Sequence, residues 1–171
     1  MIDELIRTRR THKAFGPDPV PRETLLELFE LARWAPNHHL TDPWRFRVLG
    51  EQAKRTLKDA AEAAKPGSGA KLDRAPTLIV ASAKQIGDAE QDHEDVLATA
   101  VASYIVLLGA HARGLAGYWR TVPVIATPAG RRATQMPDDE LPIGLLHLGD
   151  PRQEQRVPDR APVDEIAMFL P

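Results

Sequence analysis

The sequence predicts a single α+β domain that spans residues 1–171. Two short apolar runs, 77–81 and 143–148, are typical of strands that are covered on both faces. Other segments, such as 21–34 and 51–64, have apolar residues at helical spacing, and the two kinds of segment do not alternate strictly along the chain. A chain of this length buries about 70% of its unfolded surface on folding, so its core needs neither a disulfide nor a metal.

The N-terminal part is predicted to contain two helices and one strand. Residues 3–9 form a short helix that runs into a basic segment. The proline-rich segment 16–21 is extended, because proline fixes φ and moves the preceding residue out of the helical region. A second helix covers 21–34 and ends at the Ala35-Pro36 bond. The alternating pattern of 44–49 then predicts a half-buried strand.

The middle of the chain contains two further helices around the first apolar strand. Helix 51–64 is followed by 67–72, which lacks the Gly-Lys-Ser/Thr ending of a phosphate loop and is expected to be a solvent loop. The longest helix, 88–113, begins with acidic residues and is apolar from Val96 to Leu108. Polar residues such as Thr99 interrupt that stretch, so we expect a buried central helix rather than a membrane span.

The C-terminal part adds two strands, a short helix and a tail. Residues 117–121 and 143–148 are predicted strands, and 127–135 a short helix between them. The tail, 152–171, contains several prolines and shows little periodicity. We expect it to wrap over a surface of the protein or over a partner subunit.

Composition excludes several classes of function. The 22 Lys and Arg nearly balance the 24 Asp and Glu, so the chain has no overall positive field of the kind that attracts nucleic acid. The absence of cysteine excludes disulfides, thiolate nucleophiles and iron–sulfur clusters, so redox chemistry requires a bound cofactor. The charged N-terminal segment Met1–Arg7 does not fit a signal peptide, and we expect a cytoplasmic protein.

Histidines and acids form no recognisable metal motif. The pair His38-His39 and the run 92–95 are the densest clusters of metal-binding residue types, but adjacent residues do not share a helix face. We therefore expect no metal site, and interpret 92–95 as the acidic start of a helix. His111 and His147 are expected to be packed or surface residues.

The basic segment Arg9-Arg10-Thr11-His12-Lys13 has two interpretations. Arginine offers a planar fork for phosphate oxygens and lysine a compact charge, so the segment has the chemistry of a phosphate anchor. Cations are also favoured at the C-terminus of a helix, where they face solvent. Composition alone leaves both interpretations open.

Five segments fall in an informative order: Ile6–Phe15, Ala35–His38, Pro43–Phe46, Gly117–Thr121 and Ile143–Pro151. Together they resemble the FMN-dependent NAD(P)H nitroreductase family. That family has an Arg-x-Ser/Thr segment ending in Arg or Lys, an Ala-Pro loop, then Gln-Pro-Trp-x-Phe at the start of a strand. The Gly-x-x-Trp-Arg-Ser/Thr segment and the length of the chain resemble its short, YdjA-like branch.

The resemblance implies a fold, a cofactor and an assembly. The expected fold is a three-layer α+β sandwich with a central mixed sheet flanked by helices. Two subunits intertwine as a homodimer, with FMN in a crevice at their interface. The implied activity is transfer of hydride from NAD(P)H through FMN to a small-molecule electron acceptor such as a nitroaromatic or a quinone.

The resemblance also assigns roles to individual residues, and it leaves catalysis to the flavin. Arg9 and Thr11 correspond to contacts of the FMN phosphate and ribityl chain, and Lys13 or Arg10 to a cation near N1 and O2 of the ring. A cation there stabilises the negative charge of reduced flavin. The remaining cofactor-binding assignments are the ring-side loop from the other subunit, the segment along the flavin edge and phosphate, and a second phosphate contact: Pro36, Asn37, His38, Trp119, Arg120, Thr121 and Arg156.

One departure from the family pattern keeps alternatives open. Asp42 stands where the family usually has glutamine, which replaces an amide donor with a carboxylate. The alternatives are a flavin-binding protein without turnover and other flavin chemistry, such as dehalogenation or flavin fragmentation, on the same fold. The sequence has no dinucleotide motif that selects NADH or NADPH.

Overall fold

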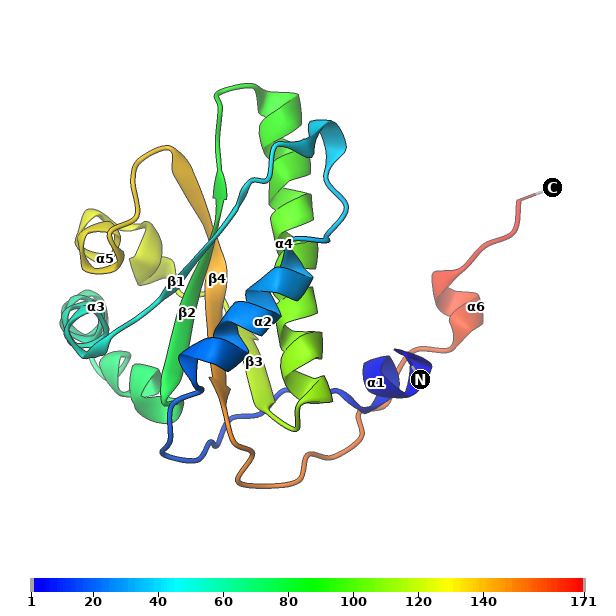
Figure 1. Ribbon diagram of the computed structural model, residues 1–171, viewed down its shortest axis with the longest axis horizontal. Helices are drawn as coiled ribbons and strands as arrows, with labels where there is room; N and C mark the ends of the chain where they lie inside the picture. Colours follow the sequence, from blue (N-terminus) through cyan, green and yellow to red (C-terminus); the bar gives the residue numbers. More distant parts are fainter. Residues whose placement is uncertain (1, 171) are drawn as a thin grey trace.

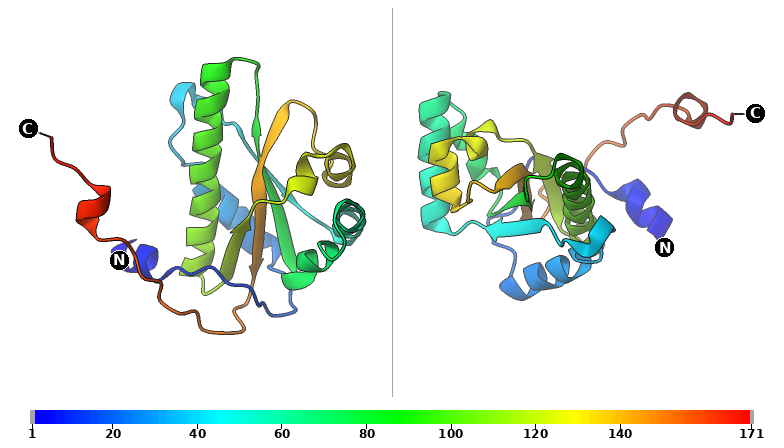
Figure 2. Two further views of the ribbon diagram at one scale, coloured as in Figure 1. Left: turned by 180° about the vertical axis from the view of Figure 1, so that it is seen from behind. Right: turned by 90° about the horizontal axis from the view of Figure 1, so that it is seen from above.

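The computed structural model describes residues 2–170 and has three layers (Figure 1). A four-stranded sheet in the order β1-β2-β4-β3 forms the middle layer. Helices α2 and α4 cover one face of the sheet, and α3 and α5 cover the other (Figures 1 and 2). This is the predicted α+β sandwich. The strands are β1 (Trp44–Val48), β2 (Thr77–Lys84), β3 (Ala116–Arg120) and β4 (Glu140–Gly149).

Helices α1 to α5 lie close to their predicted positions, whereas the short helix α6 in the tail was not predicted. Helix α3 has the predicted limits, and the side chains of Asp88 and Thr127 cap the N-termini of α4 and α5. Gly114 follows α4 with a φ of 76°, a conformation that glycine adopts without strain. The helices are α1 (Ile2–Thr8), α2 (Arg22–Ala32), α3 (Glu51–Ala64), α4 (Ala89–Ala112), α5 (Pro128–Thr134) and α6 (Val163–Ile166), with 3₁₀ turns at His38–Leu40, Gly69–Arg74 and Pro123–Ala126.

Burial of the two central strands explains their continuous apolar sequence. Alternate residues of β2 and β4 face opposite layers, so Leu78 and Leu145 pack against α3 and α5 while Ile79 and Leu146 pack against α2 and α4. All neighbouring strands of the sheet are antiparallel. The resemblance implied a mixed sheet. Within residues 2–170 the one parallel pairing is an isolated bridge between Thr11 and Gly117. That bridge fixes the basic segment to the edge of β3.

Helix α4 packs as the central helix of the fold. By length and composition it is the one helix within residues 2–170 that is able to span a membrane, and half of its most apolar window is buried inside the protein. Ala102, Val106 and Ala110 face the core at helical spacing. Leu97 and Val101 lie on the opposite side and are exposed.

The prediction of a solvent loop at 67–72 is wrong. Gly69–Arg74 forms a 3₁₀ turn that packs against α3, and Leu72 is fully buried in the core. The carboxylate of Glu62 accepts hydrogen bonds from the backbone N–H groups of Gly67 and Gly69. Burial of Leu72 and these two bonds hold the turn against the protein.

The tail projects from the body of the protein on the same side as α1 (Figures 1 and 2). Its apolar side chains are open to solvent, and Phe169 is 96% exposed. Exposure of several apolar side chains to water is unfavourable, and exposed apolar patches are typical of interaction surfaces. The exposed tail therefore favours contact with another molecule.

Candidate functional site

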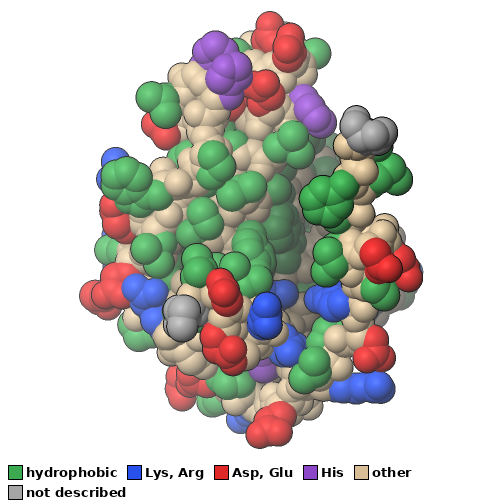
Figure 3. Space-filling model, turned by 90° about the vertical axis from the view of Figure 1, so that its right-hand side faces the viewer, with side chains coloured by type: hydrophobic (Ala, Val, Ile, Leu, Met, Phe, Trp, Pro, Cys, Tyr) green, Lys and Arg blue, Asp and Glu red, His purple; other side chains and the backbone are tan. Residues whose placement is uncertain are grey.

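The two ends of the chain together form a basic cavity of about 230 Å³, called the arginine pocket below. Arg9, Arg10 and Thr11 contribute from the segment after α1, and Arg156 and Arg160 from the tail. Figure 3 shows Lys and Arg side chains around the lower end of the hollow between the body and the tail. The structure therefore brings together four of the sequence-predicted site residues, Arg9, Arg10, Thr11 and Arg156.

Contacts with neutral groups hold the two N-terminal guanidinium groups. Arg9 Nη1 donates to the carbonyl of Arg10 at 3.1 Å, and the Arg9 guanidinium lies 5.8 Å from the centroid of the Tyr104 ring. Arg10 Nη1 donates to the carbonyls of Arg7 and Arg9 at 2.6 and 2.9 Å. Within residues 2–170 neither arginine pairs with a carboxylate. Their positive charges are therefore positioned but not neutralised.

The arginine pocket contains donors that lack an acceptor. The buried atoms Arg9 Nε and Gln155 Nε2 have no hydrogen-bond partner in the described part of the chain. A buried donor without a partner costs about 1–3 kcal/mol, and an acceptor oxygen that reaches either atom recovers that cost. These donors and the unpaired guanidinium groups fit the interpretation of the basic segment as a phosphate anchor.

Two histidines stand beside the arginine pocket. Burial, followed by the nearby His111 and Arg9, lowers the pKa of His12 below its ordinary value. Burial, followed by Arg9 and Arg10, likewise lowers the pKa of His111, whose Nε2 lies 2.9 Å from Thr8 Oγ1. Both imidazoles are therefore neutral at pH 7, and the arginines supply the positive charge of the site.

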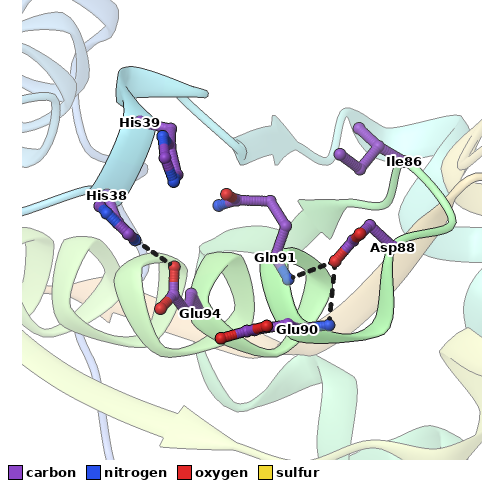
Figure 4. A pocket seen from close by; sticks show the side chains of 7 residues that line it. All are labelled: His38, His39, Ile86, Asp88, Glu90, Gln91 and Glu94. Carbon is purple, nitrogen blue, oxygen red and sulfur yellow. Dashed lines mark hydrogen bonds and ion pairs between the residues drawn. The ribbon is translucent and has the colours of Figure 1, made fainter.

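The predicted ring-side loop lies at the other end of α4. Pro36 is exposed there, and His38 Nδ1 lies 2.7 Å from Glu94 Oε2. His38 and His39 line a second cavity, of about 460 Å³, together with Gln91 and Glu94 (Figure 4). The polar atoms of Asn37 are engaged within the loop and with α4, so they hold the backbone rather than face the cavity.

The loop and the arginine pocket are far apart within one protomer. Asp95 contacts the loop, and Tyr104, whose ring lies against Arg9 of the arginine pocket, is roughly 14 Å further along α4 at 1.5 Å per residue. A phosphate group held by Arg9 therefore lies well away from the loop of the same protomer. This separation fits the expectation that the loop serves a second subunit.

The third predicted group, on β3, is divided between the two faces of the sheet. Trp119 packs on the α2 and α4 side, where its Nε1 donates to the carbonyl of Ile143 and the indole lies over Gly144. Arg120 points to the opposite side, where its Nη1 is buried without a partner among residues 2–170. Thr121 is exposed in a small cavity beside Gly144. The structure does not bring these three residues together with the arginine pocket.

Two further placements differ from what the sequence alone suggested. Lys13 is exposed and does not line the arginine pocket. Gln155, Arg160 and Tyr104 belong to the surroundings of that pocket, although sequence reasoning missed them. No local signal marks Arg160, because residues 156–160 form neither helix nor strand. Within residues 2–170 no group of three or more metal-binding side chains is close enough to hold a metal ion.

Comparisons with known proteins identify the family and the fold. Residues 6–150 match the family model described as the nitroreductase family. YdjA of Escherichia coli K12 is 29% identical over 180 residues, covering 93% of this chain and 95% of that protein. The crystal structure of a nitroreductase-like family protein from Bacillus cereus has a TM-score of 0.89 at 24% identity, covering 99% of this chain and 96% of that one. A Desulfovibrio desulfuricans protein, crystallised in complex with FMN, has a TM-score of 0.82 at 23% identity, with coverage of 99% and 96%.

Proposed function

The chain belongs to the nitroreductase family, and we propose that it is an FMN-dependent NAD(P)H oxidoreductase that works as a homodimer. Its acceptor is a nitroaromatic, a quinone or a similar small molecule. When bound, FMN takes hydride from NAD(P)H and passes two electrons to the acceptor. The protein supplies binding, orientation and electrostatics.

The arginine pocket is the observation that supports this proposal most strongly. A phosphate monoester carries close to two negative charges at pH 7 and strong acceptor oxygens. Arg9 and Gln155 each hold a buried donor without a partner within residues 2–170, and Arg9, Arg10, Arg156 and Arg160 supply positive charge. These residues fit the phosphate of FMN, with Arg9 as its principal donor and Thr11 beside the ribityl chain. The FMN complex of the Desulfovibrio desulfuricans relative also supports flavin as the ligand.

Lys13 has a separate role in the proposal. The bridge between Thr11 and Gly117 fixes the backbone two residues before Lys13, whose ammonium group is exposed. From that position we assign Lys13 to the N1–O2 edge of the flavin ring, where its charge stabilises the reduced state. The energetic effect falls on reduction of the flavin more than on its binding.

A homodimer accounts for two features that a monomer leaves unexplained. The apolar side chains of the tail and of the outer side of α4, such as Phe169, Leu97 and Val101, are exposed. The loop at Asn37 and His38 lies at the N-terminal end of α4, away from the arginine pocket of its own protomer. In the proposed dimer the tail covers the partner, and each loop closes over the flavin that the partner's arginine pocket holds.

Anaerobic reduction tests the proposal. The purified protein, loaded with FMN, is mixed with NADH or NADPH under argon, and flavin absorbance near 450 nm is followed. The proposal predicts bleaching, followed by return of the absorbance when a quinone or nitroaromatic is added. Bound flavin that neither nucleotide bleaches contradicts the oxidoreductase and favours a flavin-binding protein without turnover. A protein that takes up no FMN contradicts both.

A further inference from the structure

The loop from Asn37 to Asp42 has an unusual backbone. His39, Leu40 and Asp42 have φ values of 59°, 50° and 47°, and the only other non-glycine residue with positive φ in the described chain is Gln135. The backbone of residues other than glycine adopts this left-handed region at an energetic cost. Such conformations persist where surrounding contacts fix them. Three of them in four consecutive positions require a strong local anchor.

Asp95 of α4 is that anchor. Its side chain is 1% exposed, and one oxygen, Oδ1, accepts hydrogen bonds from Thr41 Oγ1 at 2.6 Å, Gln91 Nε2 at 3.0 Å and Asn37 Nδ2 at 3.3 Å. Asp95 forms no ion pair within residues 2–170. A buried carboxylate without a cation is costly unless hydrogen bonds satisfy it, and two of its three donors belong to the loop.

The anchor continues from Asp95 to the strained backbone. Asn37, held by Asp95 through Nδ2, accepts a hydrogen bond at its own Oδ1 from the backbone N–H of Asp42 at 2.7 Å. The bonds of Asp95 to Asn37 and Thr41 therefore hold both ends of the loop, and His38 and His39 lie between them. The two imidazole rings lie on the wall of the 460 Å³ cavity with centroids 3.8 Å apart and planes tilted by 32° (Figure 4).

We infer that Asp95 is a positioning residue that sets the loop Asn37–Asp42, and through it the affinity for the electron acceptor. The inference rests on the proposed function, in which this loop closes over the flavin of the partner. Asp95 is too deeply buried to contact a ligand itself, so it acts through the loop. Loss of the anchor weakens the site for the acceptor and leaves the arginine pocket, at the other end of α4, intact.

Paired substitutions test this inference. Asp95→Ala removes the acceptor, whereas Asp95→Asn keeps an oxygen in the same position. Thr41→Val removes one donor, whereas Thr41→Ser keeps it. Thr99→Val is the matched control, because the Thr99 hydroxyl is buried one turn further along α4 and has no partner among residues 2–170. Each variant is loaded with FMN, and KM and kcat for a quinone are measured together with the Kd for FMN.

The expected result is a rise of KM for the quinone of about tenfold in Asp95→Ala and Thr41→Val, with kcat within about twofold of the wild type and a smaller rise in the Kd for FMN, whose phosphate the arginine pocket still holds. Asp95→Asn and Thr41→Ser recover most of the loss, and Thr99→Val behaves as the wild type. A folded Asp95→Ala variant with unchanged KM overturns the inference. If Asp95→Ala does not fold, equal KM values for Thr41→Val and Thr99→Val overturn it.

Amide hydrogen exchange without flavin separates this inference from the proposed function. The anchor predicts that the Asp42 amide, which Asn37 protects, exchanges at least about tenfold faster in Thr41→Val than in Thr99→Val. Equal exchange overturns the anchor whether or not the chain binds FMN. Failure of every variant, including the wild type, to take up FMN contradicts the proposed function, while the exchange data still decide whether Asp95 holds the loop.

Discussion

The guanidinium group of Arg9 lies over the ring of Tyr104, 5.8 Å from its centroid. This contact joins the segment after α1 to the middle of α4 and directs the Arg9 side chain into the arginine pocket. It also explains how a charged group is held half-buried without a carboxylate: the aromatic face is attractive to a cation and still leaves the N–H donors free. The pocket is thus prepared for an anion before any ligand arrives.

Removal of the Arg9 side chain is predicted to release FMN. A charge-assisted contact to phosphate contributes about 1.5–3 kcal/mol, so Arg9→Ala raises the Kd for FMN by about 10- to 100-fold. Arg9→Lys keeps the positive charge but loses the planar pair of N–H donors, so its Kd for FMN lies between those of the wild type and Arg9→Ala. Fluorescence titration measures the Kd, and Arg22→Ala, an exposed arginine at the start of α2, is the control. Wild-type affinity in Arg9→Ala removes the phosphate role.

Removal of Lys13 is predicted to affect reduction more than binding. Lys13→Ala slows the reduction of bound flavin by NAD(P)H by about tenfold, because a cation no longer stabilises the charge at N1–O2. Stopped-flow bleaching at 450 nm gives the rate, and titration gives the Kd for FMN. A variant that binds FMN poorly but reduces it at the normal rate reverses the assignment.

Arg47 and Glu140 form a partly buried ion pair that is predicted to stabilise the sheet. Two hydrogen bonds, of 2.6 and 2.7 Å, join the guanidinium of Arg47 on β1 to the carboxylate of Glu140, and Ser82 also donates to that carboxylate. Removal of one partner leaves a charge without compensation, so Glu140→Ala lowers the free energy of unfolding by about 3 kcal/mol. Urea denaturation at pH 7 measures the change. A loss under about 0.5 kcal/mol contradicts the prediction.

The same pair predicts sensitivity to acid. Burial alone raises the pKa of Glu140, but hydrogen bonds from Arg47 and Ser82 outweigh it and hold the pKa below its ordinary value. A carboxylate with a lowered pKa in the folded state contributes stability above its unfolded pKa and loses it as the pH falls through the folded value. Glu140→Gln therefore has a smaller drop in stability below about pH 4.5 than the wild type.

His147 is predicted to add a second loss of stability in acid. Burial lowers its pKa to about 4, and both ring nitrogens lack partners within residues 2–170. The unfolded chain binds this proton more readily, so the contribution is complete above about pH 6.5 and falls, by about 3 kcal/mol in total, as the pH drops to about 4. His147→Leu removes this component. Urea midpoints at pH 7 and pH 5 test it, and parallel curves for the two proteins contradict it.

Truncation is predicted to dissociate the proposed dimer. A chain that ends at Arg160 keeps every tail residue of the arginine pocket and loses the exposed apolar residues Val163, Ile166, Met168, Phe169 and Leu170. The dimer weakens by about a hundredfold, because such residues supply much of the energy of an interface. Sedimentation at micromolar concentration distinguishes dimer from monomer, with Val48→Ala, an exposed apolar residue at the end of β1, as control. A truncated chain that stays dimeric contradicts the role of the tail.

The parts of the structure that could be predicted from the sequence depend on local signals. Helix α3 has the predicted limits because Gly50 precedes it and the Pro66-Gly67 step follows it. The 3₁₀ turn at Gly69–Arg74 was missed because burial of Leu72 against α3, a tertiary contact, decides it. Periodicity alone does not reveal such contacts.

The candidate site could be predicted only in part. Arg9, Arg10 and Thr11 stand in one contiguous motif, and the resemblance found them. Arg160 lies in a segment without periodicity, so its approach to Arg9 depends on the path of the tail. Asp95 was correctly placed at the acidic start of a helix, but its burial under the loop follows from how Asn37 and Thr41 fold onto α4.

A comparison of FMN with riboflavin tests the central claim most directly. The two ligands share the ring and the ribityl chain and differ in the phosphate, which is the group that the arginine pocket is proposed to hold. Titration of the purified protein is predicted to give a Kd for FMN at least about 100-fold lower than that for riboflavin, with the difference reduced to about tenfold or less in Arg9→Ala. Equal affinity of the wild-type protein for the two ligands, or no binding of either, would contradict the account.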